Sequence, residues 1–153
     1  MSENDFQKYL NRAMTYCAYK EKCEHDVRTK LKEWGAKDEM HDVIIDYLSA
    51  NKFVDNQRYT NAYVNDAVKL KLWGRIKIRA MLKMKNIPDW IINQSFREID
   101  ETEYRKALTK LLQTKIKSKT LTDIEKQKIV KSMYSRGYEP EIVFEMIDVI
   151  ESN

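Results

Sequence analysis

A short basic segment, residues 69–85, contains the side chains best suited to bind a polyanion. It reads KLKLWGRIKIRAMLKMK, and no acidic residue occurs between residues 67 and 88. Ammonium and guanidinium groups bind phosphates, so this composition indicates either a nucleic-acid partner or a solvated helix face. The binding candidates in this segment are Lys69, Lys71, Trp73, Arg75, Lys77, Arg79 and Lys83.

Trp73 lies within this basic segment, beside a glycine, and outside the apolar pattern described below. An aromatic ring in such a place can stack on a base or fill a pocket of a partner. It can also act as a wedge between the first and second of the structural units described below. The sequence leaves both roles open.

A second basic segment covers residues 104–122, which hold six Lys or Arg and no acid. Its candidates for a second patch are Lys115, Lys117 and Lys119. The net charge of the chain is +4, and acids and bases roughly balance outside the two segments. The charge distribution favours a polyanionic partner, although it does not identify one.

Residues arranged for catalysis are missing from the sequence. It has no glycine-rich phosphate loop, no G-x-S-x-G and no H-E-x-x-H, and His25 and His41 each adjoin an acid in a charged context. The spacing of Cys17, Cys23 and His25 lacks the tight cysteine pair and the fourth ligand of a structural zinc site. We therefore expect no enzyme activity, no metal and no cofactor.

The first residues, MSENDFQKYL, do not resemble a signal peptide, and no apolar run approaches the roughly 20 residues that span a membrane. Two cysteines fit reduced thiols. We expect a cytoplasmic protein without a membrane partner.

An internal repeat predicts the elements that position the basic residues. Only three Gly and two Pro interrupt the chain, which favours an all-α fold. A shift of 51 residues aligns segments that begin at Val27, Ile78 and Ile129, with apolar residues at matching positions. A residue that tolerates a left-handed helix end follows each apolar stripe, namely Gly35, Asn86 and Gly137. Each segment therefore predicts a helix, a C-cap and a second helix.

A further amphipathic segment precedes each pair, so the sequence predicts three tandem three-helix repeats, residues 1–52, 53–102 and 103–153. Such small units bury apolar surface against their neighbours and stack into an elongated, curved, solenoid-like module. Because Ile78 and Leu82 supply a buried stripe, we predict a helix that starts near Gly74. On this helix Arg75, Arg79 and Lys83, spaced four apart, would share one outer face.

Residues 53–87, FVDNQRYTNAYVNDAVKLKLWGRIKIRAMLKMKNI, resemble the RecX regulatory proteins, which modulate the bacterial RecA recombinase. The positions that match the pattern of this family include Asp55, Arg58, Tyr59, Gly74, Ile78 and Leu82. Asn56 and Asn86 depart from it, where the family has Asp and Gly. We expect Asp55 to cap the first helix of the second unit, and Arg58 to pair with Asp55 or another acid nearby.

The resemblance implies a regulator, without enzyme activity, that binds the RecA nucleoprotein filament as a monomer. It would mainly inhibit the recombinase, ATPase and coprotease activities, and bind single- and double-stranded DNA more weakly, in a salt-sensitive manner. Two alternatives stay open from the residues. One is a sequence-tolerant DNA-binding helical protein without a recombinase partner, and the other is an adaptor that binds only proteins, with its lysine-rich faces solvated.

Overall fold

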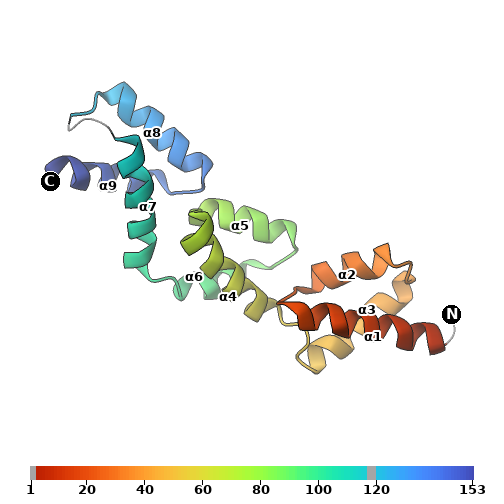
Figure 1. Cartoon of the computed structure of the whole chain (residues 1–153). Coiled ribbons are helices and arrows are strands. Elements are labelled where there is room, and N and C mark those ends of the chain that lie inside the picture. Colours follow the sequence, from red (N-terminus) through yellow and green to blue (C-terminus); the bar gives the residue numbers. More distant parts are fainter. Residues whose placement is uncertain (1–2, 117–119) are drawn as a thin grey trace.

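The computed structural model describes residues 3–116 and 120–153, and no strand occurs in these two ranges (Figure 1). The all-α prediction is confirmed. The elements are α1 (Glu3–Tyr19), α2 (Glu24–Glu33), α3 (Asp38–Ala50), α4 (Asn56–Asp66), a π-helical turn (Ala67–Lys71), α5 (Arg75–Met84), α6 (Asp89–Arg97), α7 (Glu101–Lys115), α8 (Asp123–Ser135) and α9 (Pro140–Ser152).

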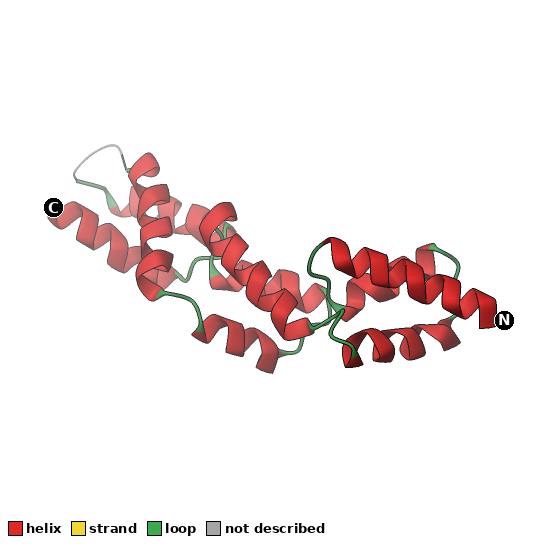
Figure 2. Cartoon of the chain, turned by 60° about the horizontal axis from the view of Figure 1, so that its bottom comes forward, coloured by secondary structure: helices red, strands yellow, loops and turns green. Residues whose placement is uncertain are grey.

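The helices form a bent, elongated row with the two termini at opposite ends (Figures 1 and 2). Helix α1 packs against α2 and α3 at one end, α4 packs against α6 in the middle, and α9 packs against α7 and α8 at the other end. This arrangement agrees with the predicted elongated module. Within the described residues, no helix has the length and apolar character needed to cross a bilayer.

The division into units 1–52, 53–102 and 103–153 stays a prediction, with one correction. Helix α7 starts at Glu101, and the Asp100 carboxylate accepts hydrogen bonds from the backbone N–H groups of Thr102 and Glu103. A boundary at 103 would cut this capped helix. The third unit, as we use the term below, therefore begins at Asp100.

The three predicted helix ends are confirmed. Gly35, Asn86 and Gly137 have φ angles of 88°, 59° and 97°, which lie in the left-handed region. After each of them the chain turns back, as when the Ala36 N–H donates to the Leu31 carbonyl at 2.9 Å. The second helix of each pair then begins, at Asp38, Asp89 and Pro140.

The basic segment is helical on both sides of a tight turn. Helix α4 continues into the π-helical turn, which ends where Leu72 takes a left-handed φ of 55°. Helix α5 then begins at Arg75 with Gly74 as its N-cap, so the predicted start near Gly74 is confirmed. The polar–apolar alternation in KLKLWGRIKI is therefore not a strand.

Two hydrophobic cores hold the row together. One lies within the first unit and includes Leu10, Val27, Leu31 and Ile44. The other runs continuously through the second and third units, from Val64 and Ile78 to Tyr104, Tyr138 and Ile147. Cys23, which precedes α2, packs into this second core. The second and third units thus share one core, whereas the first unit has a core of its own, to which Phe53 and Val54 of the second unit contribute.

Candidate polyanion-binding surface

Two glycines set the position of the basic segment against the third unit. The Gly74 N–H donates to the Arg136 carbonyl and the Ile76 N–H donates to the Gly137 carbonyl, both at 2.9 Å. A Cβ atom on Gly74 would lie 2.3 Å from the carbonyl carbon and oxygen of Gly137. Because only glycine lets the two backbones approach this closely, the start of α5 is fixed against the turn between α8 and α9.

Four side chains gather at this contact, and we call Lys71, Trp73, Lys77 and Arg136 the junction cluster. The Trp73 ring is partly buried against the shared core, and the ammonium groups of Lys71 and Lys77 lie 4.6 and 4.4 Å from its centroid. Lys71 also lies 5.5 Å from the centroid of the Tyr63 ring. The aromatic surface holds the two charges in place by cation–π attraction.

Arg136 joins this cluster from the third unit, and sequence reasoning missed it. Its guanidinium donates to the Lys71 carbonyl at 2.8 Å and to the Leu72 carbonyl at 3.2 Å, which caps the end of the π-helical turn. The sequence feature that could have identified Arg136 is its position directly before Gly137, the glycine at the predicted helix end. Among the described residues, no carboxylate forms an ion pair with Lys71, Lys77 or Arg136. The junction cluster therefore carries uncompensated positive charge.

Arg75 does not share an outer face with Arg79 and Lys83, so that part of the prediction is wrong. Its side chain is only 21% exposed and forms ion pairs with Glu101 and Glu139. Its guanidinium carbon lies 4.0 Å from the centroid of the Tyr104 ring. The physical reason is that α5 starts at the junction, so its first side chain is enclosed by α7 and the start of α9.

Tyr104 completes this enclosed network. Its hydroxyl accepts from the Arg75 backbone N–H at 2.9 Å and donates to the Glu139 carboxylate. Burial and the neighbouring carboxylate raise the pKa of Tyr104, so it remains a neutral donor. Arg75 is thus used for packing within the protein.

Arg79 and Lys83 are partly compensated by one acid of α6. The Asp89 carboxylate accepts from Arg79 at 2.9 Å and lies 3.4 Å from the Lys83 ammonium. Arg79 also donates to the Asn93 side chain at 2.6 Å. Both basic side chains stay substantially exposed, at 38% and 50%. Their positive potential is therefore weaker than that of the junction cluster.

The remaining basic candidates differ in position. Lys69 and Lys115 are exposed, and no ion pair involves either within residues 3–116 and 120–153. Lys117 and Lys119 lie outside the described residues. Of the three residues of the predicted second patch, only Lys115 therefore lies within the described residues.

The family-motif residues serve mainly to build the fold. The Asp55 side chain caps α4 by accepting from the Arg58 N–H at 3.0 Å, and Arg58 pairs with Glu21 of the first unit. Tyr59 packs against the larger core, while Ile78 and Leu82 are fully buried in it. Gly74 makes the close backbone contact described above. Asn56 departs from the family pattern, and its side chain accepts a hydrogen bond from the Glu24 N–H at 2.9 Å.

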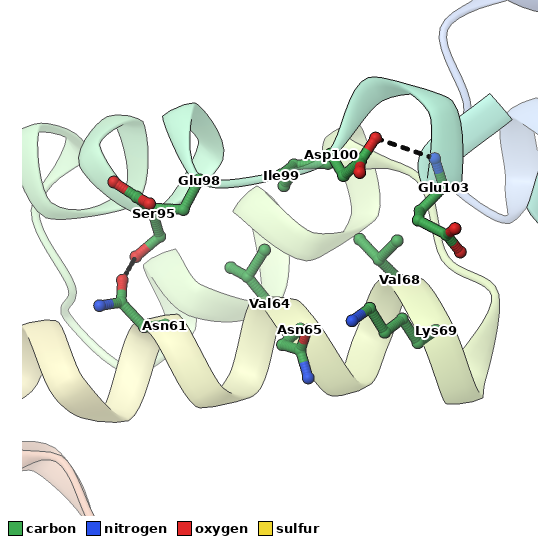
Figure 3. A pocket seen from close by; sticks show the side chains of 10 residues that line it. All are labelled: Asn61, Val64, Asn65, Val68, Lys69, Ser95, Glu98, Ile99, Asp100 and Glu103. Carbon is green, nitrogen blue, oxygen red and sulfur yellow. Dashed lines mark hydrogen bonds between the residues drawn. The ribbon is translucent and has the colours of Figure 1, made fainter.

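A hollow of about 180 Å³ lies beside Lys69, between α4 and the segment that joins α6 to α7 (Figure 3). Val64, Val68 and Ile99 supply its apolar surface, and the carboxylates of Glu98, Asp100 and Glu103 surround it (Figure 3). These carboxylates repel phosphate, so we do not include this hollow in the polyanion-binding surface.

Two family models match this chain. The first three-helix domain of RecX matches residues 10–48, and the second three-helix domain of RecX matches residues 55–95. Together they cover more than half of the 153 residues.

Individual relatives agree with these matches. The "Regulatory protein RecX" of Prosthecochloris aestuarii is 26% identical over 153 residues, which is the full length of both chains. That of Clostridium botulinum (strain Eklund 17B / Type B) is 31% identical over 130 residues, 82% of this chain and 60% of the relative. The crystal structure of RecX from Lactobacillus salivarius superposes with a TM-score of 0.89, at 19% identity, over 99% of this chain and 100% of that one. The chain belongs to the RecX family of regulatory proteins.

Proposed function

We propose that this protein binds the RecA nucleoprotein filament and inhibits its recombinase, ATPase and coprotease activities, without catalysing a reaction itself. Membership of the RecX family supports the regulatory role. The observation that carries the proposal is the junction cluster: Lys71 and Lys77 lie over the Trp73 ring, Arg136 bonds to the neighbouring backbone, and no carboxylate among the described residues compensates these charges.

The junction cluster suits the phosphate backbone of filament DNA. Each cation that neutralises a phosphate releases a condensed counterion, so affinity falls as the salt concentration rises. Trp73 restrains two flexible lysines, and the glycine contact fixes the surface beneath them. Less conformational entropy is then lost on binding. The elongated row of helices provides further surface along the filament for contacts with the recombinase protein.

The first test is the ATPase activity of RecA on single-stranded DNA as this protein is titrated in. Binding to naked DNA is followed in parallel across a range of salt concentrations. Inhibition at protein concentrations far below those that coat the DNA supports direct engagement of the filament. Inhibition only at saturation of the DNA, or none, contradicts the proposal.

A double variant, Lys71→Gln with Lys77→Gln, tests the surface itself. Removing two phosphate contacts should lower the slope of log affinity against log salt by about two units and require about tenfold more protein for inhibition. The control is Lys32→Gln with Lys37→Gln, which removes the same charge from exposed positions in the first unit. Equal inhibition by both variants would refute the role of the cluster.

The second candidate is a sequence-tolerant DNA-binding protein without a recombinase partner. Lys115 favours it, because this exposed lysine forms no ion pair with any described residue and can add a phosphate contact that does not depend on a filament. Binding to naked DNA as tight as binding to a filament would support this candidate. We propose that the protein acts as a monomer in either case, with single- and double-stranded DNA as weaker partners.

A further inference from the structure

A second hollow lies between the first and second units, with a volume of about 590 Å³. Tyr59, Ala62, Tyr63 and Asp66 line it from α4. These residues follow the three- and four-residue spacing of one helix face, opposite the face that lines the acidic hollow of Figure 3. Its volume is within the range of small-molecule sites.

Lys22, in the loop between α1 and α2, lines this hollow and is only 6% exposed. Its ammonium lies 4.6 Å from the centroid of the Tyr16 ring, and within the described structure it forms no hydrogen bond or ion pair. Burial of the charged group lowers the pKa of Lys22. The Lys22 side chain is largely buried and its ammonium forms no ion pair, so an anion beside it would be favourable.

Three tyrosines of the same hollow offer hydrogen-bond donors. The hydroxyls of Tyr16, Tyr59 and Tyr63 form no hydrogen bond with any described residue. Burial raises the pKa of each, that of Tyr16 to about 12, so all three keep their protons at neutral pH. Neutral tyrosine hydroxyls among the residues that line one hollow are suited to donate to phosphate oxygens.

The carboxylates of the hollow are largely compensated. Glu21 is paired with Arg58, and Asp26 is paired with Lys85. Asp66 is the third carboxylate of the lining, and Lys20 and Lys71 line the hollow as well. The charge of Lys22 is therefore in excess.

We propose that this hollow binds a phosphate-bearing ligand, with Lys22 as its charge partner and the tyrosine hydroxyls as donors. The volume exceeds that of a phosphate group and admits a nucleotide. The phosphate could belong to a free nucleotide or to a nucleotide unit of single-stranded DNA. Neither source requires a recombinase, so this site does not depend on filament inhibition.

The test uses the full chain and isothermal titration calorimetry with AMP and with inorganic phosphate. The wild type should bind AMP, and Lys22→Met should weaken binding by about 10- to 100-fold, the range expected for a lost charged hydrogen bond. Lys32→Met, which removes an exposed charge on α2, should leave the affinity unchanged. Measurable AMP binding with the same affinity in the wild type and Lys22→Met would overturn the proposal.

Two further measurements keep the result unambiguous. Tyr59→Phe removes one hydroxyl and little packing, and it should weaken AMP binding by about 5- to 10-fold even if Lys22→Met does not fold. A single-stranded dT oligonucleotide identifies the source: if only the oligonucleotide binds, and Lys22→Met weakens it, the ligand is a DNA phosphate. If Lys22→Met and Tyr59→Phe bind every probe as the wild type does, no such site exists.

One further variant tests the phosphate-binding hollow separately from the proposed inhibition of the filament. Lys77 belongs to the junction cluster but does not line the hollow. Lys77→Gln should therefore weaken filament inhibition while AMP affinity stays unchanged. Loss of AMP binding in this variant would contradict the assignment of the hollow.

Discussion

The two junctions between neighbouring units are built from different interactions. Between the second and third units, backbone meets backbone at Gly74 and Gly137, and one hydrophobic core continues across the boundary. Between the first and second units the apolar contacts come from a few residues, Cys23 in the larger core and Phe53 and Val54 at the smaller one, and polar contacts join the units as well. The polar contacts are the ion pairs Asp26–Lys85 and Glu21–Arg58, the Glu24–Asn56 hydrogen bond and the His25–Asn86 contact.

This difference determines which part of the row is rigid. Backbone contact and shared apolar burial resist salt and permit little sliding, because close-packed groups have one arrangement. Ion pairs that stay partly exposed, such as Glu21–Arg58 and Asp26–Lys85, are screened by salt and are individually weak. The junction cluster is positioned by the packed junction, whereas the 590 Å³ hollow lies at the polar one. We therefore expect a fixed phosphate-binding surface beside an adjustable pocket.

The largest expected effect comes from Gly137→Ala. An added Cβ would lie 2.4 Å from the Lys77 Cβ, at a φ of 97° that side chains rarely adopt. We expect a loss of about 3 kcal/mol or more in the free energy of unfolding, measured by urea denaturation. Gly35→Ala is the control, since its φ is 88° but its nearest neighbour, the Tyr9 hydroxyl, is 3.8 Å away. It should lose only about 1 kcal/mol. Equal losses would mean that the close contact is unimportant.

Tyr104→Phe should have the next largest effect. The variant loses the hydroxyl that accepts a hydrogen bond from the Arg75 N–H and donates one to the Glu139 carboxylate. Both groups then lack this partner inside the packed junction. We expect a loss of about 2 kcal/mol in the free energy of unfolding. Tyr138→Phe is a matched control because the Tyr138 hydroxyl is buried and has no hydrogen-bond partner among the described residues. This control should be neutral or stabilising, and the opposite ranking would refute the network.

At the polar junction, Asp26→Asn should cost about 1 kcal/mol. Its carboxylate is 12% exposed and paired with the 39% exposed Lys85. The Arg28–Asp42 pair provides the control, because its side chains are 47% and 78% exposed. Asp42→Asn should change the free energy of unfolding by less than about 0.5 kcal/mol. A cost for Asp26→Asn as large as that of Gly137→Ala would remove the contrast between the junctions.

The pH dependence of this pair has a defined sign. Burial alone would raise the pKa of Asp26, but the Lys85 ammonium and the donors at Cys23 hold it below its usual value. A group with a lowered folded pKa stabilises the protein above its unfolded pKa, near 4, and this contribution disappears as the pH falls through the folded value. The stability difference between the wild type and Asp26→Asn should therefore shrink on acidification below about pH 4. A difference that grows would contradict the pairing.

The smallest effect concerns local opening, measured by amide hydrogen exchange. The N–H groups of Gly74 and Ile76 bond to backbone across the packed junction, whereas the Glu24 N–H bonds to the Asn56 side chain across the polar one. We expect Glu24 to exchange at least about tenfold faster, and more so in about 0.5 M salt. Similar rates at all three amides would show that both junctions open together.

The helical repeat could be read from local patterns, and so could several details. Positive φ values at Gly35, Asn86 and Gly137 and the cap at Asp55 follow from residue types placed beside amphipathic stripes. The start of α7 was misplaced because the capping role of Asp100 was not recognised. The burial of Arg75 was missed because its partners, Glu101 and Glu139, are distant in the sequence.

The sequence by itself determined that this protein is an all-α repeat of the RecX type with a concentrated basic segment, because apolar spacing and cap residues act over a few turns of one helix. Only the tertiary structure decided which charges are free. The contact between Gly74 and Gly137 brings Arg136 to Lys71, encloses Arg75 between two carboxylates, and leaves Lys71 and Lys77 beside Trp73. The reason is physical: the compensation of a charge depends on distance in space, and spatial neighbours here lie more than 60 residues apart in the chain.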